Sequence, residues 1–217
     1  MSAQPAPVEA NGFRILSQSA SALGQSDAFT AQADDPSAVY YNPAGMTQLK
    51  GLQVMAGGLI IGGGTTFTQA ATGLKTRSDL GGTVATPPPL YGYATWNLAG
   101  VGEKLNLRPL ERVTLGFGVL SPFGLKVQWP ATTTAPLNTA LTSVAVELVD
   151  FKPTVAVKVL PDLSVGVGAD IYTYLNMYGQ GHAEIQFNSS GGPGLPPAGT
   201  PIEINGRNTT AGFNLSL

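Results

Sequence analysis

Apolar and polar positions alternate along much of the chain after residue 50. The clearest runs are RVTLGFGVL, KPTVAVKVL, PDLSVGVGADIYTYL and AGFNLSL. In the first run Val113, Leu115, Phe117 and Val119 share one face, and Thr114, Gly116 and Gly118 share the other. A period of two is typical of strands in a sheet whose two faces meet different surroundings. We therefore predict five strands and the start of a sixth, near residues 52–64, 89–98, 112–121, 144–159, 163–175 and 208–217.

The second face of these strands favours a membrane barrel over a soluble sheet. A soluble sandwich would carry Lys, Glu and Arg there, whereas this face carries mainly Gly, Ser, Thr, Asn and Ala. Small polar residues suit the interior of a transmembrane barrel whose apolar face meets lipid. A secreted soluble β-sandwich is disfavoured for the same reason. Trp96, Trp129, Tyr172 and Tyr174 lie near predicted strand ends, where interfacial aromatic residues are expected.

The connections between the predicted strands differ in length. Residues 160–163 form a tight turn, whereas 122–143 and 176–206 are long connections at the opposite end. Outer-membrane barrels have short turns on one side, long loops on the other and an even number of at least about 8 strands. The sequence therefore predicts an all-β, antiparallel transmembrane β-barrel, of which residues 51–217 supply the first strands. Because the chain stops within an alternating run, we expect further strands beyond it.

The first fifty residues lack this alternation. Residues 11–50 are rich in Ser, Ala and Gln and predict short helical turns. Asp35 is expected to cap a helix that begins at Pro36, and Asn42 to Gly45 has the chemistry of a turn. Residues 1–10 are rich in Pro and Ala, and we interpret them as a disordered tail or the remainder of a signal peptide.

Composition excludes several classes of function. Charged residues make up only 11% of the 217 residues, yet mean hydropathy is +0.12. No apolar run approaches the ~18 residues of a transmembrane helix. The net charge of −2 provides no basic surface for nucleic acid, so nucleic acid is not an expected partner. Cys is absent, which excludes disulfide and thiolate chemistry.

Candidate catalytic and metal-binding residues are few. His182 is the only histidine and has no positioned Ser and Asp partners, so a catalytic triad is not expected. A metal site built from several His or Cys ligands is excluded by their number. Gly62 to Gly64 lacks the Lys and Ser or Thr of a phosphate-binding loop. Asp34 and Asp35 could pair as acids, but helix capping and local hydrogen bonding are favoured. We predict no enzyme, no metal and no cofactor.

One long motif resembles a known family. The run NGFRILSQSASALGQSDAFTAQADDPSAVYYNPAGMTQLKG, followed by a strand and then LGFGVLSPFGL, resembles the FadL/TodX outer-membrane transporters of long-chain fatty acids and other hydrophobic compounds. The specific part runs from Asn11 to Gly51, and Pro-Phe-Gly-Leu at 122–125 supports it. The resemblance implies a barrel of about fourteen strands when complete, in the outer membrane of a Gram-negative bacterium. A small N-terminal hatch, here residues 11–50, would plug it, and residues 1–10 would be leftover signal peptide.

The resemblance also implies roles for individual residues. In the family, ligand is captured from outside in an apolar groove, passes to a pocket in the barrel, and leaves sideways beside a kinked third strand. Carried over, the ligand contacts are Gly12, Phe13 and Ile15, the residues beneath the lateral opening are Asn42, Pro43, Ala44 and Gly45, and the residues in the kinked strand are Gly116 and Gly118. The resemblance implies three kinds of partner: hydrophobic small molecules such as long-chain fatty acids, outer-membrane lipids and lipopolysaccharide. It also implies that the complete protein is monomeric.

Passive uptake of hydrophobic compounds is thus the leading hypothesis. A fatty chain binds through apolar area at about 25 cal/mol per Å², and its carboxylate needs a polar or basic group. Arg14, Lys126 and Lys152 are the candidate cations, each interpreted first as a solvated surface residue. The alternative hypothesis is a structural or adhesive outer-membrane barrel with a fixed plug and functional outer loops.

Overall fold

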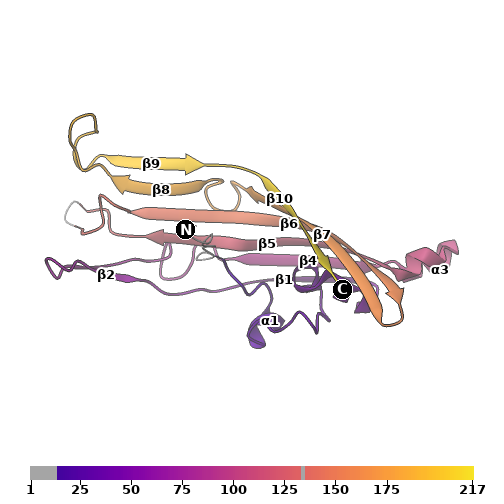
Figure 1. Cartoon of the computed structure of the whole chain (residues 1–217). Coiled ribbons are helices and arrows are strands. Elements are labelled where there is room, and N and C mark those ends of the chain that lie inside the picture. Colours follow the sequence, from indigo (N-terminus) through magenta and orange to yellow (C-terminus); the bar gives the residue numbers. More distant parts are fainter. Residues whose placement is uncertain (1–13, 133–134) are drawn as a thin grey trace, which may run out of the picture.

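An antiparallel β-sheet forms the main body of the chain in the computed structural model, which describes residues 14–132 and 135–217. Neighbouring strands follow the order β1–β4–β5–β6–β7–β10, and β8 pairs with both β6 and β9 (Figure 1). Strands β2 and β3 form a separate small sheet. The strands are β1 (Leu52–Gly58), β2 (Thr66–Thr68), β3 (Lys75–Arg77), β4 (Leu90–Asn97), β5 (Val113–Gln128), β6 (Ser143–Leu160), β7 (Leu163–Tyr174), β8 (Ala183–Asn188), β9 (Pro201–Gly206) and β10 (Thr210–Ser216).

The helices are short and lie mainly before the sheet. They are α1 (Ala20–Gly24), α2 (Ala38–Tyr41) and α3 (Ala99–Leu105), with the 3-10 helices η1 (Pro43–Gln48) and η2 (Arg108–Arg112). None of the helices in the described part of the chain has the length and apolar character needed to cross a membrane.

The strands predicted from alternation are all present, but the predicted ends of the first and the third are wrong. The first was predicted over 52–64, whereas β1 ends at Gly58. The connection expected at 122–143 begins only after Gln128, because β5 continues through Pro122. Pairing between β5 and β6 shifts register between Leu120 and Phe123 and then resumes. A proline lacks the amide donor that a ladder requires, so it interrupts the alternation without ending the strand.

The long connection predicted at 176–206 contains regular structure. Strands β8 and β9 form a hairpin within it, from Ala183 opposite Gly206 to Asn188 opposite Pro201. The prediction of one extended connection was wrong here because the Gly- and Pro-rich stretch between these two strands dominated the composition. By contrast, the tight turn at 160–163 is confirmed, since Leu160 pairs with Leu163. The hairpin lies at the end of the sheet opposite α3 and this turn (Figure 1).

The two faces of the sheet differ as the alternation predicts. On β5, Leu115 and Phe117 point outward and are 39% and 45% exposed, whereas Thr114 is buried. Tyr172 and Tyr174 were predicted to be interfacial, and this is wrong. Both share the inner face of β7 with Asp170, and Tyr174 is only 8% exposed. Their parity along the strand, not their nearness to its end, decides which surroundings they meet.

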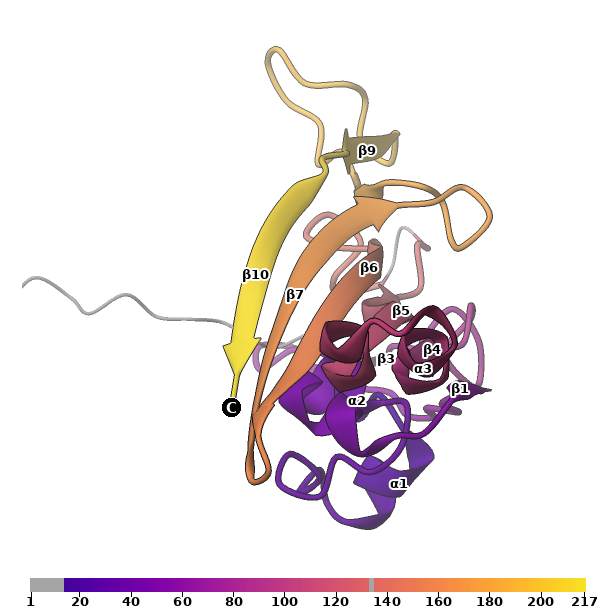
Figure 2. The ribbon, with the colours of Figure 1, turned by 90° about the vertical axis from the view of Figure 1, so that its right-hand side faces the viewer.

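Residues 14–50, termed here the N-terminal segment, pack on the inner face of the sheet (Figure 2). Tyr93 on β4 donates a hydrogen bond from its hydroxyl to the carbonyl of Gln18 at 2.7 Å. At the other side of the sheet, Ser216 on β10 accepts a hydrogen bond from the amide of Ala44 at 2.8 Å. The sheet therefore curves around the segment. The core between them consists of Ala33, Ala38, Val39, Met46, Tyr91, Tyr93, Leu120 and Ala156.

The helix expected after Asp35 forms slightly later than predicted. Helix α2 begins at Ala38 rather than at Pro36. Ser37, not Asp35, precedes the helix at the cap position. The carboxylate of Asp35 bonds locally just ahead of it, because Oδ1 accepts from the amide of Ser37 at 2.8 Å and from its hydroxyl at 2.6 Å. The interpretation of Asp35 as a local hydrogen-bond acceptor is confirmed.

Candidate functional site

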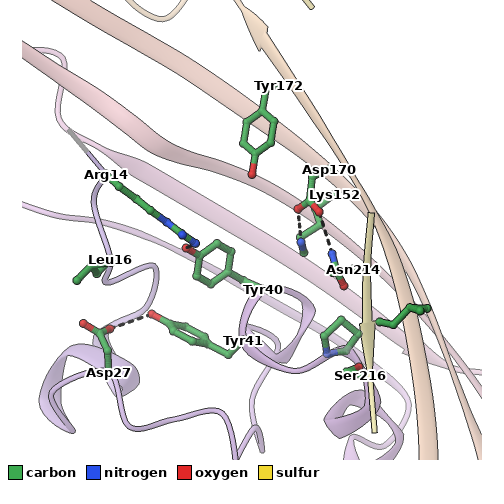
Figure 3. Close-up of a pocket in the computed structure, with 12 residues that line it drawn as sticks. Arg14, Leu16, Asp27, Tyr40, Tyr41, Lys152, Asp170, Tyr172, Asn214 and Ser216 are labelled. Carbon is green, nitrogen blue, oxygen red and sulfur yellow. Dashed lines mark hydrogen bonds and ion pairs between the residues drawn. The ribbon is translucent and has the colours of Figure 1, made fainter. Parts of the chain in front are cut away.

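A cavity of about 470 Å³ lies between the N-terminal segment and the inner face of β6, β7 and β10 (Figure 3). Its volume is within the range of about 300–1,000 Å³ typical of small-molecule sites. Its lining combines charged, aromatic and aliphatic side chains. The lining residues are Arg14, Leu16, Asp27, Tyr40, Tyr41, Pro43, Lys152, Asp170, Tyr172, Asn214, Leu215 and Ser216.

Arg14 places a guanidinium group at the edge of this cavity (Figure 3). Its Nη2 atom donates to the hydroxyl of Tyr40 at 3.0 Å. That hydrogen bond raises the pKa of Arg14 above its usual value, so the group stays charged. Among the residues that the structure describes, no carboxylate lies within 4.0 Å of it. A guanidinium presents several donors in a planar fork that fits a carboxylate, so Arg14 can bind an anion in the cavity.

Lys152 does not play the same part, although it lines the same cavity. It is 4% exposed and forms an ion pair with Oδ1 of Asp170. The other carboxylate oxygen of Asp170 accepts from Asn214 Nδ2 at 2.9 Å. The interpretation of Lys152 as a solvated surface residue is therefore wrong. Since Asp170 neutralises Lys152, Arg14 is the cation of this lining that has no carboxylate within 4.0 Å among the described residues.

Tyr41 forms the wall opposite the sheet. Its hydroxyl accepts from the amide of Gln18 at 2.8 Å and donates to Oδ1 of Asp27 at 3.1 Å. The hydroxyl of Ser17 donates to the other oxygen of Asp27 at 2.7 Å. Burial raises the pKa of Tyr41, so the phenol remains neutral and keeps both bonds. This network holds the two halves of the N-terminal segment together beside the cavity.

The predicted ligand contacts are only partly within the described residues. Gly12 and Phe13 lie outside them. Ile15 is buried, at 6% exposed, and its amide donates to the carbonyl of Pro122 at 2.8 Å. Its neighbours Arg14 and Leu16 are the residues that line the cavity. A ligand contact by Ile15 stays a prediction.

The Asn-Pro-Ala-Gly turn packs against β7 and β10. A Cβ atom added to Gly166 of β7 would lie 2.6 Å from the carbonyl carbon of Pro43. The amide of Ala44 donates to Ser216 on β10, as described above, and Asn42 Nδ2 donates to the carbonyl of Thr30 at 3.0 Å. Gly45 is buried against Ala33 within the N-terminal segment. The turn therefore connects the N-terminal segment to β7 and β10, at one end of the cavity.

Gly116 and Gly118 lie in β5, the third strand of the main sheet. A Cβ atom at Gly116 would be 2.5 Å from Met46 Sδ, and one at Gly118 would be 3.2 Å from Val39 Cγ1. These glycines therefore allow the N-terminal segment to approach the strand. The irregular pairing of β5 occurs later, between Leu120 and Phe123.

A second, mainly apolar cavity of about 360 Å³ borders that irregular stretch. Its lining residues are Leu90, Tyr91, Gly92, Val119, Leu120, Ser121, Val149, Leu175, Met177 and Tyr178. Tyr178 closes one side, because its hydroxyl accepts from Ser121 Oγ at 2.7 Å and donates to the carbonyl of Pro88 at 3.1 Å. Met177 beside it is 91% exposed. The cavity is therefore bordered by the connection that follows β7.

Sequence reasoning missed most of the residues around both cavities. A usable signal existed for Asp170, since it shares the small-residue face of its strand with Gly166 and Gly168. On β6, Lys152 likewise lies on the same face of its strand as Ala156, because the two are an even number of residues apart. No comparable signal marks Tyr40 and Tyr41, because the segment that carries them has no regular period.

Comparisons with known proteins agree with this arrangement. The sequence profile of a family described as "outer membrane protein transport protein (OMPP1/FadL/TodX)" matches residues 2–217. A protein of Neisseria meningitidis serogroup B whose name places it in the outer membrane is 29% identical over 131 residues, covering 57% of this chain and 25% of that protein. The crystal structure of a Pseudomonas aeruginosa FadL homologue aligns with a TM-score of 0.52 at 16% identity, covering 84% of this chain and 43% of the homologue.

The similarity to the solved structure concerns the fold, an antiparallel barrel wall with few helices. The chain aligns with less than half the length of each of these two relatives. The predicted resemblance, fold class and outer-membrane location are confirmed. Because the family profile matches nearly the whole chain, the chain belongs to the OMPP1/FadL/TodX family of outer-membrane transport proteins.

Proposed function

We propose that this protein takes up long-chain fatty acids or related hydrophobic compounds passively across the outer membrane. The observation that carries the proposal is the position of Arg14, a cation without a carboxylate partner among the described residues, at a cavity that Leu16 and Leu215 also line. A fatty acid has features complementary to these, since its anionic head matches the cation and its apolar chain matches the leucine side chains. Burying the chain contributes about 25 cal/mol per Å² of apolar area, and the guanidinium orients the head.

The second cavity supplies an entry site in this proposal. Met177 and Leu175 lie in the connection after β7, and with Leu90 they present apolar surface at its mouth. A flexible Met side chain adapts to ligands of different shape. The hydrophobic compound would bind here first and then move along the barrel wall toward Arg14.

Residues 14–50 act as the hatch in this proposal, and the irregular stretch of β5 is the lateral exit. The amide of Ile15 donates to the carbonyl of Pro122 at 2.8 Å, so hatch and irregular stretch are joined by a backbone hydrogen bond. Arg14 and Leu16 flank that bond in the sequence and line the cavity. Ligand binding that displaces Arg14 would pull on the same short piece of chain, and the compound could then leave sideways into the membrane. The mechanism needs no catalytic step.

Uptake measurements test the proposal. Cells carrying the full-length protein, in a background without other transporters of this kind, should accumulate labelled oleate faster than cells without it. Toluene, an uncharged compound, is measured in parallel. A folded barrel in the outer membrane with no uptake of either compound would overturn the proposal and support the structural or adhesive alternative.

Substitution of Arg14 tests the role of the cation. Arg14→Gln is expected to lower oleate uptake about tenfold, which corresponds to about 1.4 kcal/mol of lost interaction, because a charge-assisted hydrogen bond to the carboxylate is removed. Toluene uptake should be unchanged. Arg108→Gln is the matched control, since Arg108 lies in η2 at the far end of the sheet. Equal loss for both compounds would mean that Arg14 has only a structural role.

A further inference from the structure

Three side chains with metal-binding atoms meet at the β8–β9 hairpin, and none of them lines either cavity described above. His182 precedes β8, Glu184 lies in β8 and Glu203 lies in β9 (Figure 1). One nitrogen or oxygen atom from each lies within 4.8 Å of the others. In the hairpin register Glu184 is opposite Asn205 and Glu203 is opposite Gln186, two residues along. Glu184 and Glu203 are therefore diagonal neighbours on one face of the hairpin, within reach of long side chains.

Glu184 is buried, but not all of its carboxylate has hydrogen-bond partners among the described residues. Its side chain is 4% exposed, and its Oε1 atom has no hydrogen-bond partner among the described residues. His182 Nε2 is also buried without a partner there, 3.9 Å from Glu184 Oε2. A carboxylate that has lost its water needs a positive charge or hydrogen bonds to remain ionised. The unpartnered atoms of Glu184 and His182 belong to the same cluster.

The surrounding side chains do not supply that charge directly. The amide group of Gln180, in the orientation that satisfies both of its atoms, donates to Glu184 and accepts from Lys126 Nζ at 3.2 Å. Lys126 therefore reaches Glu184 only through Gln180. The backbone amide of Gln180 is bound to a further acid, Glu147, at 3.0 Å. Negative charge thus exceeds positive charge around the cluster.

We propose that His182, Glu184 and Glu203 bind a zinc-class divalent cation. One imidazole and two carboxylates are a donor set that Zn²⁺ accepts, with water in the fourth position, whereas Ca²⁺ prefers six to eight oxygen ligands. Bond lengths of about 2.0–2.2 Å place tetrahedral ligands about 3.4 Å apart. Glu203 is exposed and His182 is partly exposed, so rotation of these two side chains can close the remaining distance.

The bound cation would fasten the hairpin to the barrel wall. Glu184 pairs with Ala145 of β6, so one ligand is fixed to the main sheet. Glu203 belongs to β9, which pairs with β8 and has no other strand partner in the described part of the chain. Metal binding would therefore hold β9 through a side chain in addition to its hydrogen bonds.

Calorimetric titration of Zn²⁺ into the tag-free, full-length protein in detergent tests this site. We expect one Zn²⁺ per chain. His182→Ala and Glu203→Gln should each weaken binding at least about tenfold, since even outer partners of metal ligands are worth about 10- to 100-fold in affinity. Both positions are less buried than Glu184, so these variants are chosen to preserve the barrel, which heat-dependent mobility in gels verifies.

Glu103→Gln is the matched control, because Glu103 is exposed in α3 at the opposite end. It should bind Zn²⁺ as the parent protein does. Absence of Zn²⁺ binding, or binding that the His182 and Glu203 variants leave unchanged, would overturn the proposal. Because transport is not measured, the result is independent of the uptake proposal.

Discussion

Lys152 and Asp170 show how single residues on the inner face depend on one another. Both are buried, at 4% and 9% exposed, on neighbouring strands, and they form the ion pair beside the cavity. The sequence could have placed both on the inner face, because each continues the small-residue parity of its strand. Their pairing was not predictable, since it depends on the register between β6 and β7. That register is set by the tight turn and by packing of the whole sheet.

Removing one partner of this pair is expected to destabilise the barrel. Asp170→Asn leaves the ammonium group of Lys152 buried without its counter-charge, and breaking a buried pair in this way costs about 3–5 kcal/mol. The measurement is urea unfolding of the detergent-solubilised protein, followed by tryptophan fluorescence. The double variant Lys152→Met/Asp170→Asn should recover most of the loss, because the buried ammonium group is removed together with its partner. If the single variant unfolds at the same urea concentration as the parent protein, the pair contributes no stability.

Elements were predictable to the extent that their sequence has a period. The alternating runs within β5, β6, β7 and β10 were predicted with their faces, whereas the part of β5 beyond Pro122 was missed. The hairpin of β8 and β9 was missed, because its strands are short and flank a loop rich in Gly and Pro. The N-terminal segment has no period, since its helices have only four to six residues and are held by contacts with the sheet. A stretch without periodicity gives no information about which face it will cover.

The η1 element permits a test of the hatch, because it contacts the sheet without belonging to it. Pro43→Ala is expected to lower oleate uptake by about half or more while changing the free energy of unfolding by less than ~1 kcal/mol. Proline fixes the backbone at the start of the 3-10 helix, and its loss lets the turn move, whereas the strand pairing of the barrel is untouched. Uptake and urea unfolding are measured on the same preparation.

Pro109→Ala provides the control for this experiment. Pro109 also lies at the start of a 3-10 helix, η2, but at the end of the sheet near α3. Its substitution should leave uptake unchanged. Parallel losses of uptake and stability in Pro43→Ala would show that the turn serves the barrel fold rather than the movement of a hatch.

At the scale of the whole molecule, the sheet separates two environments. Outward-facing Leu115, Val155 and Val167 are direct neighbours across β5, β6 and β7, and each is between 39% and 46% exposed. The inner face of the same strands carries Thr114, Thr154 and Asp170, all of them buried. In an outer-membrane protein the outward row meets lipid. Large apolar exposure is therefore the expected state of this surface rather than a defect.

The lipid-facing surface leads to a prediction that depends on depth. Arg placed outward near the bilayer midplane of a barrel costs about 2–4 kcal/mol, falling to about 0–1 kcal/mol near the interface. Val167 lies four residues, or about 13 Å of strand, beyond Leu163, which adjoins the tight turn. Val167→Arg should therefore lower the urea midpoint in lipid vesicles much more than Leu163→Arg does. Both residues face outward and are similarly exposed, at 46% and 39%, so the comparison isolates depth. Equal effects of the two substitutions in vesicles would show that this face does not meet the hydrocarbon core.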